Sequence, residues 1–175
     1  MVEPAPLSLD HIVALVRAST DAAVLEVRAL GEHARLAPAP GEWGANEVLG
    51  HLVEADRRGF VGRIRALLAS DRPLFEAWDQ PAVAAARRDA EREPAALVEE
   101  FRAERGEGLR FVASLDPGSL GRLGVHPHVG ELSASDLLHE WVYHDREHLA
   151  QLLAITQAIV WPAMGNARRF SDPSA

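Results

Sequence analysis

The segment from residue 139 to residue 153, HEWVYHDREHLAQLL, holds three histidines in an otherwise apolar helical pattern. At about 100° per residue, His144 and His148 lie on the same side of a helix, within its apolar stripe. Imidazoles four residues apart on a helix have Cβ atoms roughly 5–6 Å apart, close enough to hold one ion. The pair is therefore a workable two-ligand motif for zinc, nickel or iron(II). His139 lies roughly 140° around the helix from His144, and we expect it to be exposed or at a subunit contact.

A His-x-x-x-His pair without further support is more often two half-buried histidines that are hydrogen-bonded to carboxylates or carbonyls. Position 145 is Asp, so the His-Glu-x-x-His motif of zinc proteases is absent. A third candidate ligand is His51, in the stretch GANEVLGHLVEAD, where it borders the apolar stripe of its own helix. If the two helices are neighbours, three imidazoles could hold one ion and leave positions open for water or substrate.

Carboxylates and amides near these histidines could orient the rings by bonding to their second ring nitrogens. The candidates are Glu47 and Glu54 beside His51, and Asp145 and Gln151 beside the pair in the last helix. The alternative for each of them is a solvated surface residue. If His51 is not a ligand, we expect a boundary histidine that bonds to Glu47 or Glu54.

Two further histidines, His126 and His128, lie in the stretch VHPHV. Pro127 restricts the residue before it to extended backbone, so we expect a loop in which the two side chains point apart. The alternative is that this loop covers a pocket and contributes one histidine to it.

The elements that must position these residues are four helices, since four long segments show helical periodicity and none shows convincing strand alternation. The expected helices span about 8–32, 45–69, 94–115 and 134–160, and residues 161–175 form a tail. Gly106 and Gly108 weaken the third helix, each by about 1 kcal/mol relative to alanine. The 175 residues therefore predict one all-α domain, a four-helix bundle.

The amino-acid composition excludes several types of catalytic and metal-binding site. The chain has no cysteine and no lysine, which excludes disulfides, thiolate ligands, a cysteine nucleophile and Schiff-base chemistry within it. The net charge of −8 argues against nucleic acid or an anionic membrane as the main partner. No targeting segment or membrane span is recognisable, so a cytoplasmic location is expected.

Trp43, the stretch EVLGHLVEADRRGF (47–60) and the stretch HDREHLAQL (144–152) together resemble the DinB/YfiT-like superfamily. The resemblance covers nearly the whole chain, including the number and spacing of the helices. It implies a four-helix bundle, often dimeric, in which three histidines hold a divalent metal. By position, the implied ligands are His51, His144 and His148. Zinc or nickel is the metal expected first, with iron or manganese as alternatives.

The resemblance implies two classes of activity on small-molecule substrates. One is metal-dependent hydrolysis. The other is the transfer of low-molecular-weight thiols, such as bacillithiol or mycothiol, to electrophiles, or isomerisation with such a thiol as cosubstrate. The competing hypothesis is a non-catalytic stress-response protein that binds a metal or a small ligand. A third possibility is a purely structural bundle without a metal. A homodimer is also expected from the resemblance.

Overall fold

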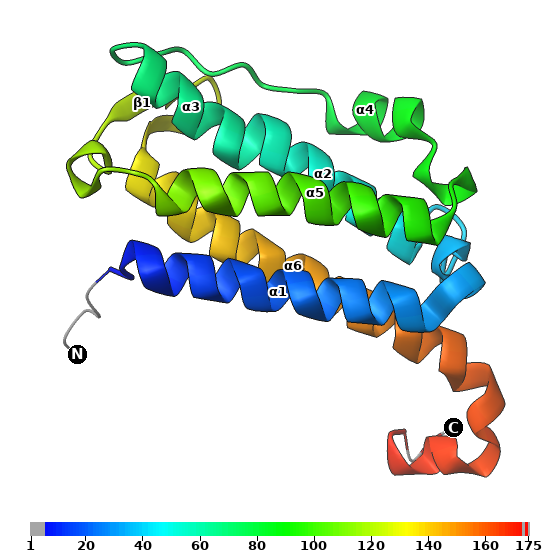
Figure 1. Cartoon of the computed structure of the whole chain (residues 1–175). Helices are drawn as coiled ribbons and strands as arrows, with labels where there is room; N and C mark the ends of the chain where they lie inside the picture. The colour runs from blue at the N-terminus through cyan, green and yellow to red at the C-terminus, as the bar shows by residue number, and fades with distance from the viewer. Residues whose placement is uncertain (1–5, 173, 175) are drawn as a thin grey trace.

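The computed structural model describes residues 6–172 and residue 174, and the chain is mainly helical (Figure 1). Its long helical segments are α1 (Leu9–Leu30), a continuous run of α2 (Ala45–Glu54), a π-helical segment (Ala55–Phe60) and α3 (Val61–Ala69), then α5 (Pro94–Ala113) and α6 (Ala134–Val160). Helix α1 packs along α5 and α6, and α2 packs against the same two helices. This is the predicted four-helix bundle. In the described part of the chain, no helix is long and apolar enough to cross a membrane.

The connections hold more structure than the sequence predicts. Strands β1 (Leu123–His126) and β2 (Gly130–Ser133) form an antiparallel hairpin where a loop was expected. Each strand is four residues long, which is too short for an alternating pattern to stand out. Shorter helices complete the chain: the α-helix α4 (Gln80–Arg87) and the 3-10 helices η1 (Gly31–Arg35), η3 (Asp89–Glu91), η4 (Pro117–Ser119) and η5 (Trp161–Phe170), the last within the expected tail.

The connection between α3 and α5 crosses the outside of the bundle and is fastened to the hairpin (Figure 1). The backbone N–H of Phe75 donates to the carbonyl of Val125, and the N–H of Val125 donates to the carbonyl of Pro73. At Gly124 a Cβ atom would lie 2.4 Å from the ring of Phe75, so only glycine fits this approach. The hairpin and this connection therefore form one wall beside α3.

The apolar core divides into two clusters, one around Trp141 and the other around Leu49. Along each long helical segment, buried polar residues lie between the members of one cluster and those of the other. A layer of polar side chains therefore crosses the bundle between two apolar regions. Its members include Ser19 and Thr20 in α1, Asp56 in the π-helical segment, Arg105 in α5 and Asp145 in α6.

Arg105 is the centre of this polar layer and is only 1% exposed. Its two terminal nitrogens donate to the two carboxylate oxygens of Asp145 at 2.6 and 3.0 Å. Its Nε lies 2.9 Å from Oδ2 of Asp56. The guanidinium also lies 4.9 Å from the ring centre of Phe101 and 5.0 Å from that of Trp141. One cation thus joins carboxylates from two other helical segments.

Two buried carboxylates, those of Asp56 and Asp145, share a single buried cation, the guanidinium of Arg105. Burial raises the pKa of Asp56 to about 7, although the charge of Arg105 opposes the rise. Burial also raises the pKa of Asp145, again against the effect of Arg105. Removal of the guanidinium would leave both carboxylates in the interior without a cation.

The π-helical segment Ala55–Phe60 interrupts the helix that the sequence predicts to be uniform over 45–69. The N–H of Val61 donates to the carbonyl of Asp56, five residues back, which defines the wide turn. A Cβ atom on Gly62 would lie 2.1 Å from the carbonyl oxygen of Arg57, so glycine is needed here. The turn directs the buried side chain of Asp56 toward Arg105. It also directs Phe60 toward His144, and the centres of these two rings lie 5.3 Å apart.

We predict that Arg105→Met lowers the free energy of unfolding by about 3–5 kcal/mol, because it leaves two buried carboxylates unpaired. Urea denaturation followed by circular dichroism measures this. The matched control is Arg102→Met on the exposed face of the same helix, which should change stability by no more than about 0.5 kcal/mol. Equal effects of the two substitutions would contradict the role assigned to the ion pairs.

Candidate metal centre

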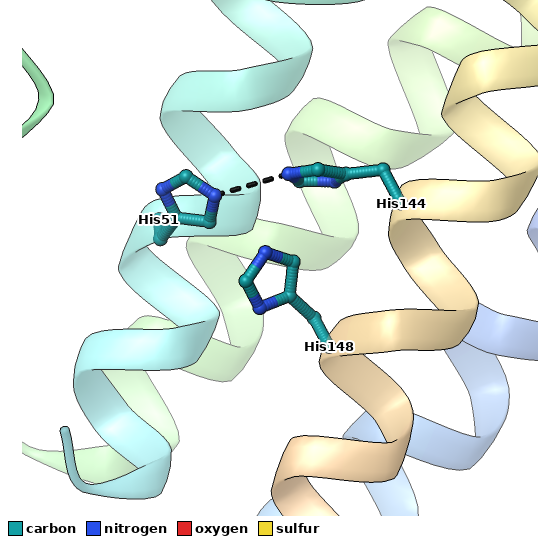
Figure 2. A group of neighbouring side chains, drawn as sticks. All are labelled: His51, His144 and His148. Carbon is teal, nitrogen blue, oxygen red and sulfur yellow. Dashed lines mark hydrogen bonds between the residues drawn. The ribbon is translucent and has the colours of Figure 1, made fainter. Parts of the chain in front are cut away.

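Three histidines from two helices converge inside the bundle (Figure 2). His51 comes from α2, and His144 and His148 come from α6. Each offers a ring nitrogen, and these nitrogens all lie within 4.8 Å of one another. The Nε2 atoms of His51 and His144 are 3.1 Å apart. The two helices are neighbours, as the sequence argument requires.

The spacing and protonation of these rings fit a divalent ion. Two imidazole nitrogens on one tetrahedral zinc, each at about 2.0–2.1 Å, lie about 3.3 Å apart, close to the separation of the His51 and His144 Nε2 atoms. Burial, with His148 as the second cause, lowers the pKa of His51 to about 4. Burial, followed by the two neighbouring histidines, lowers the pKa of His144 to about 3. Both rings are therefore neutral at pH 7, the form that binds metals.

A hydrogen bond fixes the tautomer of one ring. The Nδ1 of His148 lies 2.8 Å from the side-chain oxygen of Gln151, which can only accept, so this nitrogen carries the hydrogen. The lone pair of its Nε2 is then free for an ion. In His144, Nδ1 is buried and has no hydrogen-bond partner among the described residues.

The other side chains expected beside the histidines have different partners. The carboxylate of Glu47 accepts from the backbone N–H of Gly44 at 2.8 Å and caps α2. Glu54 is buried and forms ion pairs with three arginines, Arg57, Arg58 and Arg87. Asp145 bonds to Arg105 rather than to a ring nitrogen. Of the four expected neighbours, Gln151 is the one whose hydrogen bond to a candidate ligand is observed.

Aromatic rings surround the three histidines. Phe60 meets His144 edge to face, with ring centres 5.3 Å apart. Trp43 lies 5.2 Å from His51, and Trp78 is stacked on His51 at 6.1 Å. Such walls lower the local polarity and limit the access of water, which strengthens electrostatic interactions in the site.

A cavity of about 800 Å³ opens beside the histidines, and His51 and His144 lie in its wall. The wall also includes His126 and His128, whose rings are 5.6 Å apart. The expectation that these two side chains point apart is therefore wrong, because the hairpin brings both rings to the same cavity. His139 is half-buried and points elsewhere, and its Nε2 accepts from the backbone N–H of Leu7 at 3.1 Å.

Several residues of the site were not predicted from the sequence. Arg105 and Asp56 both occupy positions four residues from apolar core residues, and a charge within an apolar stripe is a usable sign of a buried ion pair. Asp145 was expected beside the histidines, but its ion pair with Arg105 was not. Trp78 and Arg63 gave no such sign, since their places in the cavity depend on how the chain crosses the bundle.

The sequence profile of the DinB superfamily matches residues 10–152, which is most of the chain. The chain belongs to the DinB superfamily. No curated protein matches this DinB-superfamily chain in sequence.

Two solved structures share its fold. The first is YfiT from Bacillus subtilis, described as a probable metal-dependent hydrolase with an unusual four-helix bundle topology. It has a TM-score of 0.78 at 15% identity, over 91% of this chain and 93% of that one. The second is the mycothiol-dependent maleylpyruvate isomerase, with a TM-score of 0.69 at 11% identity. This match covers 83% of the present chain and 61% of the isomerase.

We predict that His144→Ala abolishes stoichiometric metal binding, because it removes one of three converging donors. Elemental analysis of protein purified without a histidine tag measures this, and the unaltered protein should hold close to one divalent ion per chain. The control is His139→Ala on the same helix, which should keep its metal. Unchanged metal content in His144→Ala would disprove the site.

We also predict that Gln151→Leu weakens metal affinity by about 10- to 100-fold, because the ring of His148 loses the acceptor that fixes its tautomer. Competition with a chromophoric chelator measures the dissociation constant. Gln157→Leu, at an exposed position of the same helix, is the matched control. Equal affinities of the two variants would show that the hydrogen bond to His148 has no effect on the metal.

Proposed function

We propose that this protein is a divalent-metal-dependent enzyme that acts on a small molecule. The observation that carries the proposal is the convergence of His51, His144 and His148 beside a cavity of about 800 Å³. Three imidazole ligands leave a coordination position open, which catalytic sites need and closed structural sites lack. The cavity is of a size typical for small-molecule sites.

The residues around the site have separable roles in this proposal. The three histidines hold the ion, and Gln151 keeps the proton of His148 on the nitrogen that faces away from it. Phe60 and Trp78 exclude water from one side of the rings. A divalent ion bound there would supply Lewis acidity and lower the pKa of a water or a thiol beside it.

Two activities remain within this proposal, hydrolysis and the use of a low-molecular-weight thiol as cosubstrate. The likeness to YfiT, described as a probable hydrolase, supports the first. The likeness to a mycothiol-dependent isomerase supports the second. Zinc or nickel is proposed as the metal, with iron or manganese as alternatives. The proposal includes a homodimeric state and a cytoplasmic location.

We predict that the metal-loaded protein turns over substrates of one of these two classes. The test uses protein reconstituted with zinc, nickel, iron(II) or manganese and two panels of compounds. One panel contains simple esters and amides. The other combines mycothiol, bacillithiol or cysteine with small electrophiles. Turnover in the ester and amide panel identifies a hydrolase, and thiol-dependent turnover identifies a transferase or isomerase.

Each panel is repeated with His144→Ala, which should lower turnover to the background rate, and with His139→Ala, which should not. Activity that survives His144→Ala would mean that the three histidines are not the catalytic centre. Stoichiometric metal without turnover in either panel would contradict an enzyme and favour a non-catalytic metal-binding protein.

A further inference from the structure

Arg63 of α3 lies in the wall of the cavity. Its side chain is half-buried, and its buried Nε has no hydrogen-bond partner within residues 6–172 and 174. Among the described residues, none forms a hydrogen bond or an ion pair with its guanidinium. The arginines of the preceding turn differ, because Arg57 and Arg58 are both paired with Glu54.

The placement of this guanidinium is costly for the protein alone. Burying a cation without a counter-charge is unfavourable, and here burial lowers the pKa of Arg63. The guanidinium lies 5.7 Å from the ring centre of Phe75, a contact that holds it against the wall. An anionic group in the cavity would supply the missing partner.

The two histidines of the hairpin stand in the same wall. The backbone N–H of His128 donates to Nδ1 of His126 at 3.3 Å, which leaves the hydrogen of a neutral His126 ring on Nε2. Burial and then the charge of Arg63 lower the pKa of His126, which favours its neutral form, and Arg63 lines the same cavity. His126 can therefore donate one hydrogen bond beside a cation.

Three carboxylates also line the cavity, and two of them have other roles. Asp79 accepts from the backbone N–H of Ala82 at the start of α4, and Asp136 accepts from the N–H of Ser133 at the start of α6. Glu140 is exposed on α6. None of the three forms an ion pair with Arg63, so the guanidinium remains available to a ligand.

We propose that Arg63 and His126 form an anion subsite, and that the substrate carries a carboxylate held there while its reacting end meets the three histidines. The inference rests on the proposed function, because it assigns a substrate class to that same cavity. A carboxylate is favoured because its two oxygens match the planar fork of a single guanidinium. His128 holds the ring of His126 in place.

Cobalt-loaded protein and a series of thiols test the subsite, since thiolate binding to cobalt(II) gives an absorption band. The probes are mercaptoacetate, 3-mercaptopropionate and 4-mercaptobutyrate, each compared with its neutral amide. The three acids differ in the distance between thiol and carboxylate, so that one of them can reach from the histidines to Arg63. We expect at least one acid to bind about tenfold or more tightly than its amide. Arg63→Gln should remove this preference and leave amide affinity unchanged.

The matched control is Arg65→Gln on the same helix, where the arginine is exposed and paired with Glu107. This variant should keep the preference for the acid. Equal binding of acids and amides to the unaltered protein, or a preference that survives Arg63→Gln, would overturn the subsite.

A second measurement separates the subsite from the metal centre. In metal-free protein, the Nε–H signal of Arg63 in a ¹⁵N–¹H spectrum should shift on addition of butyrate and not on addition of butyramide. The signal is assigned by its loss in Arg63→Gln, or by its loss in Arg63→Lys if the first variant does not fold. If cobalt fails to bind, the metal-dependent function fails, and this spectrum still decides the subsite. No difference between butyrate and butyramide would refute it, even if Arg63→Gln did not fold.

Discussion

The buried guanidinium of Arg105 pairs with two carboxylates, those of Asp56 and Asp145. These ion pairs fix the geometry on which the site depends. Asp145 directly follows His144 in α6, and Asp56 lies five residues after His51 in the neighbouring segment. Because Arg105 of α5 binds both carboxylates, the two helices that carry the histidines are tied together through a third. A buried ion pair of this kind contributes less to net stability than to the choice of one arrangement over others. Together with the apolar stripe of α6, this contact favours the rotation of α6 in which its two histidines face inward.

The arginines around this polar layer fall into two groups, those that form ion pairs within the chain and those that do not form an ion pair with any described residue. Most arginines near the site are paired within the chain, as in the network of Arg87 and Arg92 with Glu100 and Asp89. This network holds the outer connection against α2 and α5, and it lowers the pKa of Glu100 to about 2 even though burial opposes the shift. Arg63, in the wall of the cavity, is not paired in this way. The structure thus separates charges that stabilise the fold from a charge available to a ligand.

The sequence was sufficient for the bundle and for the histidine trio as a hypothesis, because both follow from helical periodicity. His144 and His148 share a face at a spacing of four, and Gly or Pro marks most helix ends. It was insufficient for the cavity, whose walls come from segments without periodicity, such as the hairpin of His126 and His128. The role of Gly108 also could not be predicted from the sequence. Its low helix propensity suggests only that it destabilises α5, whereas in the structure a Cβ atom there would lie 2.9 Å from the side chain of Val61, so glycine permits close helix packing.

The wide turn at Ala55–Phe60 has a consequence for comparing relatives. A π-helical turn accommodates one more residue than an α-helical turn while the helix continues, so the segments on its two sides keep independent registers. A relative that lacks this residue would superpose on His51 and yet be displaced by one position at Arg63 if the two chains were aligned without a gap. Where a relative lacks the π-helical turn, an alignment of this helix therefore needs a gap inside the turn, placed by superposition, before residues on its far side are equated.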